Sequence, residues 1–561
     1  MKASLAAALA ALCLLATTPA HAEGFLRADN KQIVDATGKP VLLRGMGLGG
    51  WMLQEGYMLN AGGLPQHQVR ANISAHIGPE KTEAFYQAWR DNFITQADID
   101  AMASYGFNSV RLPMHWNLYI DETQPGTVWR EEGFAMTDRL IGWAKARGMY
   151  VILDLHAAPG GQGNDVPISD RDVTNPSLWE DPANQDRMVA LWAELARRYK
   201  DEPTVGAYDL LNEPNWGFAD PADKNGCKEP GNALLKALYE RTIKAVRDID
   251  TNHLIFIEGN CWGNNYQGLL PIADANLGLS FHKYWNYTGR ETIEPYLKLR
   301  DEFGLPLWLG ESGENSNDWM ARTIETVEAE GIGWAWWPWK KFRENNPVHI
   351  WSLETHGVET YFKPPEREPN DAVRAMAEET LMALATKAVR FENTIKNPDF
   401  VDALFRAAHS EEATPYPGQD RIGLKGGRIF AVNYDMGRNG VAYSDTVTGN
   451  YYVSTGGERT AGNTGGRYRN DGVDIGLSMD IFPYVSDIEP GEWLRYTIEV
   501  ERAGVYSLTF FPAQTGFSIQ VNGDPETQNL NRIKLNAGTN VIILKALAPS
   551  GQLNELLLEA R

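Results

Sequence analysis

The chain has 561 residues, more than a single hydrophobic core usually serves, so we expect more than one domain. Its 73 acidic residues outnumber the 52 basic ones, and the formal net charge of −21 disfavours nucleic acid, anionic lipid and polyanionic substrates. Beyond the N-terminal segment no apolar run reaches the roughly eighteen residues of a transmembrane helix, so no membrane span is expected.

The first 22 residues have the pattern of a secretory signal. Lys2 precedes an apolar run over residues 5–16, and the small residues Ala20 and Ala22 stand before the expected cleavage site. We therefore exclude residues 1–22 from the fold and expect a secreted protein, either periplasmic or extracellular. Cys227 and Cys261 remain, and we predict that they form a disulfide in an oxidising compartment; the alternative is two free thiols.

Short apolar runs alternate with helix-like segments over residues 23–390. The predicted strands are residues 41–48, 108–114, 150–156, 205–213, 253–260, 277–284, 305–312 and 331–339. Helical periodicity appears over residues 95–105, 134–147, 185–199, 233–249, 293–303 and 318–330, and a closing helix is expected over residues 371–388. This alternation predicts an α/β fold, a closed (β/α)8 TIM barrel.

Two glycine-rich stretches interrupt the barrel pattern. Residues 54–80 follow the first predicted strand, and residues 159–172 follow the third. We expect both to be long loops on the catalytic face, where they would wall off one end of a cleft.

The composition changes after the barrel. Residues 391–426 are irregular and contain Pro415 and Pro417, which indicates a linker. Over residues 427–561, short runs rich in Val, Ile, Tyr, Thr and Phe alternate with glycine turns. This predicts an all-β sandwich of the jelly-roll kind.

Polar and aromatic side chains stand at the C-terminal ends of the predicted barrel strands. In a barrel these ends meet at one mouth. The side chains are Arg111, His156, Asn212, Glu213, His282, Tyr284, Glu311 and Trp337. A lone histidine is more often a satisfied core residue, and Arg111 alone could form a structural ion pair. Their joint placement favours a catalytic site.

Two of these side chains, Glu213 and Glu311, are carboxylates. Such a pair is the minimum needed to cleave a glycosidic bond with retention, one as proton donor and one as nucleophile, about 5 to 5.5 Å apart. At that distance an ionised Glu311 should raise the pKa of Glu213, while Arg111 should keep Glu311 anionic. The simpler alternative for either glutamate is a buried structural carboxylate.

The motifs in chain order resemble glycoside hydrolase family 5 over residues 24–390. They are Leu43-Arg44-Gly45, Gly49-Gly50-Trp51, Val110-Arg111-Leu112-Pro113, Asp154-Leu155-His156, Asn212-Glu213-Pro214, His282-Lys283-Tyr284, Gly310-Glu311-Ser312, and Gly333-Trp334 through Lys340. Residues 44–51 and 337–340 look most like the branch that contains exo-acting β-1,3-glucanases. The resemblance implies a neutral β-glucan as substrate, in particular β-1,3-glucan.

The resemblance also implies roles for the residues at the mouth. Glu213 would be the acid/base and Glu311 the nucleophile, while Asn212 would hold the substrate 2-hydroxyl. Trp337 would be the stacking platform of the subsite where cleavage occurs. The residues expected to orient or tune the carboxylates are Arg111, His156, His282 and Tyr284.

The C-terminal part is similar to a family 6 carbohydrate-binding module. The motifs that carry the similarity are Asn433-Tyr434-Asp435, Gly440 to Asp445, Tyr468-Arg469, Gly472 to Ile475, Gly491 to Leu494 and Ala503 to Tyr506. Phe430 and Val432 stand where that family has glutamates for a structural calcium ion, so calcium is not expected. The second sugar-binding aromatic is missing, which leaves Tyr468 and Asn554 as remnants of a sugar site. The module is then a weak binder or purely structural.

The sequence implies no metal and no cofactor. The histidines at the strand ends lie on different strands without clustered carboxylates, and no phosphate-binding glycine loop is present. Three functions stay open: a secreted β-glucan hydrolase; a hydrolase of another β-linked glycan or glycoside, such as β-1,4-glucan, mannan or a glucosyl conjugate; and a non-catalytic carbohydrate-binding protein. We expect a monomer whose partner is a polysaccharide or oligosaccharide. The linkage, and exo or endo action, stay open.

Overall fold

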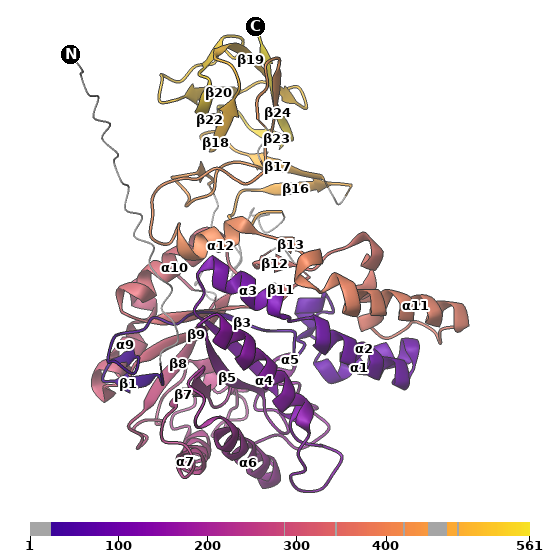
Figure 1. The fold of residues 1–561 in the computed structure, drawn as a ribbon, viewed down its shortest axis with the longest axis vertical. Coiled ribbons are helices and arrows are strands. Elements are labelled where there is room, and N and C mark those ends of the chain that lie inside the picture. Colours follow the sequence, from indigo (N-terminus) through magenta and orange to yellow (C-terminus); the bar gives the residue numbers. More distant parts are fainter. Residues whose placement is uncertain (1–23, 285, 343–344, 419–420, 447–467, 480–481) are drawn as a thin grey trace, which may run out of the picture.

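The computed structural model describes residues 24–561 except residues 285, 343–344, 419–420, 447–467 and 480–481. The predicted signal, residues 1–22, lies outside the described residues. A larger α/β part and a smaller β part are stacked along the long axis, and the C-terminus lies at the far end of the β part (Figure 1).

Eight parallel strands close into a barrel in the order β10-β3-β4-β5-β6-β7-β8-β9. The strands are β3 (Arg44–Gly47), β4 (Ser109–His115), β5 (Tyr150–Ala157), β6 (Val205–Asp209), β7 (Leu254–Glu258), β8 (Leu277–Lys283), β9 (Leu307–Gly313) and β10 (Gly333–Trp337). Nearly all of their residues are buried, as expected for strands covered on both faces. The predicted TIM barrel is therefore confirmed.

Helices surround the barrel where the periodicity predicts them. They are α3 (Gln96–Tyr105), α4 (Glu131–Ala146), α6 (Pro182–Tyr199), α7 (Ala233–Arg247), α9 (Glu294–Phe303), α10 (Asn317–Ala329) and α11 (Asp371–Ala383). The ends of α3 show why such boundaries are readable. Thr95 and Asp98 form a capping box, and Gly106 ends the helix at φ 105°, a conformation that favours glycine.

A short hairpin closes the N-terminal end of the barrel. Strands β1 (Arg27–Asp29) and β2 (Gln32–Val34) pair antiparallel. Leu26 and Ile33 are buried there in a small cluster with Tyr150 and Trp308 of the barrel strands. Because this end is plugged by apolar side chains, only the opposite mouth is left for polar chemistry.

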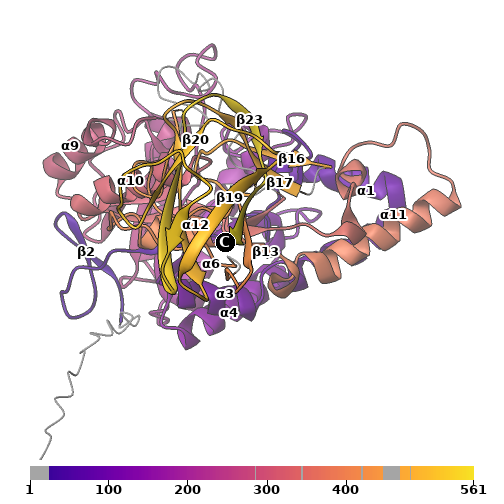
Figure 2. The same ribbon diagram turned by 90° about the horizontal axis from the view of Figure 1, so that it is seen from above.

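The stretch over residues 54–80 is not the long loop that its glycines suggest. It contains helix α1 (Gln66–Ile77), which is followed directly by α2 (Pro79–Asn92). Pro65 stands at the N-cap of α1, so the glycines and this proline form only the turn that precedes a helix. Helices α1 and α2 pack against α11, and the three extend to one side of the barrel (Figure 2).

The second expected loop, residues 159–172, is largely irregular, as predicted, with one short helix, α5 (Val166–Ser169). The disulfide prediction is confirmed: Cys227 and Cys261 are bonded with an S–S distance of 2.01 Å. Cys227 lies between β6 and α7, and Cys261 lies after β7 in the short segment α8 (Asn260–Gly263), so the bond joins two loops at the catalytic mouth.

The C-terminal part contains two four-stranded antiparallel sheets. One sheet has the order β14 (Gly426–Phe430), β24 (Glu555–Ala560), β19 (Gly504–Phe511), β21 (Ile533–Leu535), and the other has the order β15 (Tyr443–Ser444), β18 (Trp493–Val500), β22 (Gly538–Ala546), β20 (Phe517–Val521). Apolar residues from both sheets share one core. A third sheet contains β16 (Ile475–Ser478), β17 (Phe482–Ile488) and β23 (Ser550–Leu553). The predicted all-β sandwich is confirmed.

The segment over residues 391–426 is more ordered than a linker. It contains helix α12 (Pro398–Phe405), which packs against α10, and Phe400 and Leu404 belong to the hydrophobic core of the barrel. The linker prediction rested on Pro415 and Pro417. These prolines come after α12, so the linker pattern does not apply to the helix itself. Across the described residues, no helix combines the length and apolar character needed to cross a bilayer.

Candidate active site

The two predicted catalytic carboxylates meet at the C-terminal mouth of the barrel. Glu213 lies just beyond the end of β6, and Glu311 lies in β9. A carboxylate oxygen of Glu213 and one of Glu311 lie within 4.8 Å of each other, and each residue is 5% exposed. This spacing suits a pair that acts with retention, and it is shorter than the roughly 6.5 to 9.5 Å that inversion requires.

Glu213 is held in a strained and buried position. Its φ of 42° lies in the left-handed region, which is uncommon for a residue with a side chain and tends to occur at functional sites. Its backbone N–H donates to Oε2 of Glu258 at 2.7 Å, and its Oε1 lies 2.7 Å from Nδ1 of His282. The first of these contacts compensates the strained backbone, and the second orients the carboxyl group.

The environment raises the pKa of Glu213 to about 7. Burial is the main cause, the hydrogen bond and charge of His282 oppose it, and the charges of Glu311 and Glu258 add to it. The predicted effect of Glu311 on Glu213 is therefore present but secondary. A carboxyl group with this pKa keeps its proton in mildly acidic solution, as a general acid must.

Glu311 receives two charge-stabilising contacts. Nη1 of Arg111 donates to its Oε2 at 2.7 Å, and the hydroxyl of Tyr284 donates to its Oε1 at 2.5 Å. Two donors at these distances fix the orientation of the carboxylate. The predicted roles of Arg111 and Tyr284 in orienting a carboxylate agree with this geometry.

Arg111 is fully buried among four carboxyl groups. Besides Glu311, its Nη2 lies 2.9 Å from Asp209, 3.0 Å from Glu258 and 3.3 Å from Asp154. Burial, followed by the charge of Glu258, raises the pKa of Asp209 well above its ordinary value, and the charge of Arg111 opposes this shift. Arg111 is thus both a structural ion-pair partner and a contact of Glu311.

Asn212 and His156 connect to this network from the adjacent strand end. Oδ1 of Asn212 accepts from Nη2 of Arg111 at 2.8 Å, which leaves its Nδ2 3.3 Å from Nε2 of His156. Nδ1 of His156 lies 2.7 Å from Asp154. Burial alone would lower the pKa of His156, but the charge and hydrogen bond of Asp154 raise it to about 10. The contact with Asp154 fixes the orientation of the His156 ring.

Trp337, which was expected to be the stacking platform of the cleavage subsite, lies against His156, and its stacking role stays a prediction. It is 3% exposed, and its indole lies face to face with His156 at 4.8 Å and 8°. A Cβ added at Gly47 or Gly49 would come within 3 Å of this ring, so the missing side chains of these glycines make room for it. Its Nε1 donates to the hydroxyl of Tyr57 at 3.0 Å. In this structure Trp337 is part of a packed wall.

Two further glutamates belong to the site and were missed in the sequence. Glu258 is the last residue of β7, so the search for polar side chains at strand ends would have found it. Glu55 lies after β3 in the stretch that was expected to be a loop, where no periodic signal marks it. Its Oε1 lies 3.6 Å from Nε2 of His156, and burial raises its pKa to about 7 against the opposing effect of His156.

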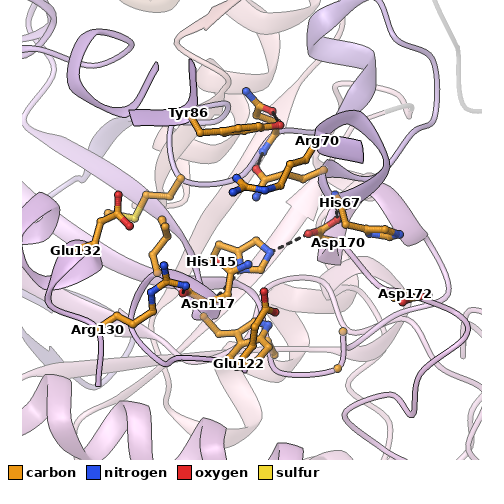
Figure 3. Close-up of a pocket in the computed structure, with 18 of the residues that line it drawn as sticks. His67, Arg70, Tyr86, His115, Asn117, Glu122, Arg130, Glu132, Asp170 and Asp172 are labelled. Atoms are coloured by element: carbon orange, nitrogen blue, oxygen red, sulfur yellow. Dashed lines mark hydrogen bonds and ion pairs between the residues drawn. The ribbon is translucent and has the colours of Figure 1, made fainter. Parts of the chain in front are cut away.

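A cavity of about 630 Å³ lies between the loops after β3, β4 and β5 (Figure 3). Its lining includes Gln54 and Ala158, which stand one residue from Glu55 and two residues from His156 in the chain. Many of its charges are paired internally: Arg70 with Glu83, and both His67 and His115 with Asp170. Its remaining lining includes amides, further charged groups and the half-buried indole of Trp116.

Gln54 is a buried polar residue of this cavity whose side-chain N–H groups have no partner among the described residues. It is 1% exposed, and its Oε1 accepts from the hydroxyl of Tyr86 at 3.0 Å, whereas its Nε2 has no partner among the described residues. A buried amide N–H without a partner is costly, so a ligand hydroxyl in this cavity would gain a ready donor. Such a cavity suits an uncharged polyhydroxylated ligand.

Three side chains of the active site have a spacing that also occurs around metal ions. Glu213, His282 and Glu311 each place one ligand atom within 4.8 Å of the others. However, Nδ1 of His282 faces Glu213 and its Nε2 faces Glu258 at 3.2 Å. Burial lowers the pKa of His282, but the charges of Glu258 and Glu311 raise it well above its ordinary value. A protonated ring has no lone pair for a metal ion. The expectation of no metal stays a prediction.

The two residues proposed for a sugar site in the C-terminal part have other contacts. The hydroxyl of Tyr468 donates to Asn433 at 2.6 Å, and its half-buried ring lies 6.1 Å from the ring of Tyr416. The side chain of Asn554 accepts from Gln552 at 2.9 Å. Sugar binding by Tyr468 and Asn554 stays a prediction, as does the similarity to a family 6 module.

Comparison with known proteins bears on the barrel. The family model Cellulase (glycosyl hydrolase family 5) matches residues 69–343. A β-xylosidase of Phanerodontia chrysosporium is 31% identical over 365 residues, which cover 58% of this chain and 73% of that protein. A probable glucan 1,3-beta-glucosidase A of Aspergillus niger is 27% identical over 281 residues, 48% of this chain and 62% of that protein. Among solved structures, an endogalactoceramidase matches 96% of this chain and all of its own chain, with 19% identity and a TM-score of 0.43.

Proposed function

The chain belongs to glycosyl hydrolase family 5, and we propose that it is a secreted hydrolase that cleaves a neutral β-glucan, in particular β-1,3-glucan, with retention. Family membership identifies the protein as a glycosyl hydrolase of a retaining family. The observation that carries the mechanism is the approach of Glu213 and Glu311 within 4.8 Å at one mouth of the barrel.

The proposed reaction has two steps. In the first, the Glu311 carboxylate attacks the anomeric carbon while protonated Glu213 gives its proton to the departing glycosidic oxygen, so a glycosyl ester forms on Glu311. The negative charge of Glu311 is then gone, and Glu213 is ionised. In the second step Glu213 takes a proton from water, whose oxygen attacks the anomeric carbon and releases Glu311.

The surrounding groups support this division of roles. Arg111 and Tyr284 donate to Glu311, which holds its carboxylate in one orientation for attack on the anomeric carbon. The pKa of Glu213, raised to about 7, favours the protonated form that a donor needs. Asn212 precedes Glu213 in the chain and contacts Arg111, which in turn donates to Glu311, so its amide would meet the substrate 2-hydroxyl.

Four observations support a glucan as the substrate and export of the protein from the cytoplasm. One relative is named a probable glucan 1,3-beta-glucosidase, and the adjoining cavity offers polar partners and Trp116 to further sugar units of a polymer. The signal-like pattern of residues 1–22 and the disulfide between Cys227 and Cys261 support export to an oxidising compartment.

A second candidate is a hydrolase of another β-linked glycan or glycoside. Of the two sequence relatives described, the one that matches more of this chain is named a β-xylosidase, so β-xylosides are tested together with β-1,4-glucan and β-mannan. Oligosaccharides of each linkage would be compared by kcat/KM. Preference for a substrate other than β-1,3-glucan would replace the linkage in this proposal, and a product profile with glucose alone would indicate exo action.

The catalytic roles would be tested with isosteric variants. Glu213→Gln and Glu311→Gln should each lose several orders of magnitude in kcat on the best oligosaccharide while remaining folded by circular dichroism. The matched control is Glu302→Gln, on the exposed surface of α9, which should keep full activity. Near-normal turnover in either catalytic variant would disprove the role given to that residue. No turnover on any glycan by the wild-type protein would favour a non-catalytic binding protein.

A further inference from the structure

The loop after the proposed nucleophile is also the surface on which the sandwich rests. Residues 312–317 connect Glu311 to α10, and Glu314 within them has a φ of 53°, in the left-handed region. Asn315 is fully buried, and its Nδ2 donates to the backbone carbonyl of Tyr284 at 2.9 Å. The hydroxyl of Tyr284 donates to Glu311, so Tyr284 contacts both this loop and the nucleophile.

The sandwich part supplies the partner of this loop through Asn470. Its Nδ2 donates to the carbonyl of Asn315 at 2.8 Å and lies 3.1 Å from Oδ1 of Asn317. Its own carbonyl accepts from the N–H of Asn317 at 2.6 Å. Asn470 is 1% exposed, so these bonds are made away from water, where a lost partner would be costly.

Asn470 is fixed in turn by charged neighbours. Its N–H donates to Asp399 of α12 at 3.2 Å, and Asp399 also accepts from Nδ2 of Asn317 at 2.7 Å. On either side of it, Arg469 and Asp471 form a buried ion pair at 2.8 Å. The barrel and the sandwich have separate hydrophobic cores, so polar contacts of this kind carry the interface between them.

We infer that the sandwich is part of the catalytic apparatus, and that Asn470 is a positioning residue which holds Glu311 in place through Asn315 and Tyr284. A module carried on a flexible tether would leave this loop without buried partners. The inference rests on the proposed role of Glu311 as nucleophile, and it assigns the sandwich a purpose that does not require sugar binding.

The test uses the full-length protein with Asn470→Ala and the isosteric Asn470→Asp, which removes the donor to Asn315 and keeps the volume. Misplacement of a reacting group by about 1 Å costs on the order of 100-fold in rate, so we expect kcat to fall about 10- to 100-fold. KM should change little, because the loop is placed to support the nucleophile and not the cavity that adjoins the site.

The matched control is Arg438→Ala. Arg438 also crosses the interface, donating to the carbonyls of Ala407 and Ala408 and pairing with Glu325 at 2.9 Å, but it does not contact the loop over residues 312–317. This variant should lower the melting temperature at least as much as Asn470→Ala and keep the wild-type kcat. A double-mutant cycle with Tyr284→Phe adds a readout that a purely structural role would not change.

If Asn470 acts through Tyr284, Asn470→Ala should cost little further activity in the Tyr284→Phe background. Equal losses of kcat in Asn470→Ala and Arg438→Ala would overturn the inference, and so would losses that multiply in the double mutant. An inactive Glu311→Gln variant combined with a normal Asn470→Ala variant would refute only this inference. An active Glu311→Gln variant would refute the proposed function as well.

Discussion

Replacing Glu213 by alanine should separate substrates by the basicity of their leaving groups. Burial raises the pKa of Glu213 from 4.5 to about 7, so at pH 6 about 90% of it is protonated, against about 3% for an unshifted group. The fraction of Glu213 that can donate a proton at that pH is therefore about thirtyfold larger than for an unshifted group. General acid catalysis itself contributes about 10²- to 10⁴-fold, which is the expected loss on a natural oligosaccharide.

The assay compares this oligosaccharide with a 2,4-dinitrophenyl glycoside of the same sugar, whose leaving group departs without a proton. For the dinitrophenyl substrate, kcat/KM of Glu213→Ala should stay within about tenfold of wild type, because attack by Glu311 is unaffected. Hydrolysis of the glycosyl ester should become limiting, because no base activates water, so a burst of dinitrophenol is expected. Equal losses on both substrates would refute the assignment of Glu213 as acid/base.

Two other predictions concern the walls of the site. In the Cys227→Ala/Cys261→Ala double variant, the free energy of unfolding should fall by roughly 4 kcal/mol, because the bond closes a loop with a 34-residue separation in the unfolded chain. The value of kcat should be kept, and an unchanged denaturation midpoint would contradict this prediction. Trp116→Ala should raise KM for oligosaccharides about tenfold and leave aryl monoglycosides unchanged, whereas the control Trp351→Ala, an exposed tryptophan outside the cavity, should affect neither.

The barrel could be predicted because parallel strands and their helices carry strong local patterns. Each strand is a run of buried apolar residues, and helix ends such as Gly106 are marked by backbone chemistry. The two inserted helices were missed because glycines and Pro65 precede α1, although Val69, Ile73 and Ile77 follow at the four-residue spacing of a buried helix face. In that stretch the glycine and proline content was taken to indicate a loop, although the spacing of the apolar residues indicates a helix.

Site residues could be predicted where they stand at strand ends. Contacts that depend on how distant parts of the chain pack together could not be predicted. Glu213 and Glu311 could be chosen by position alone, and Glu258 could have been found in the same way. The sequence could not show that Trp337 is covered by His156, because the distance between rings on different strands depends on how the barrel closes. Nor could it show how Asn470 reaches the loop after Glu311.

Glu55 decides whether the basic limb of the pH profile can be assigned to Glu213. Burial raises the pKa of both carboxyl groups to about 7, so either one could account for a loss of kcat/KM as the pH rises through that value. Glu55→Gln removes one of the two at constant volume. If Glu213 carries the catalytic proton, the variant should keep a basic limb, shifted slightly to lower pH because the charge of Glu55 no longer opposes ionisation of Glu213. A profile that becomes flat above pH 7 in Glu55→Gln would instead make Glu55 the group whose proton is required.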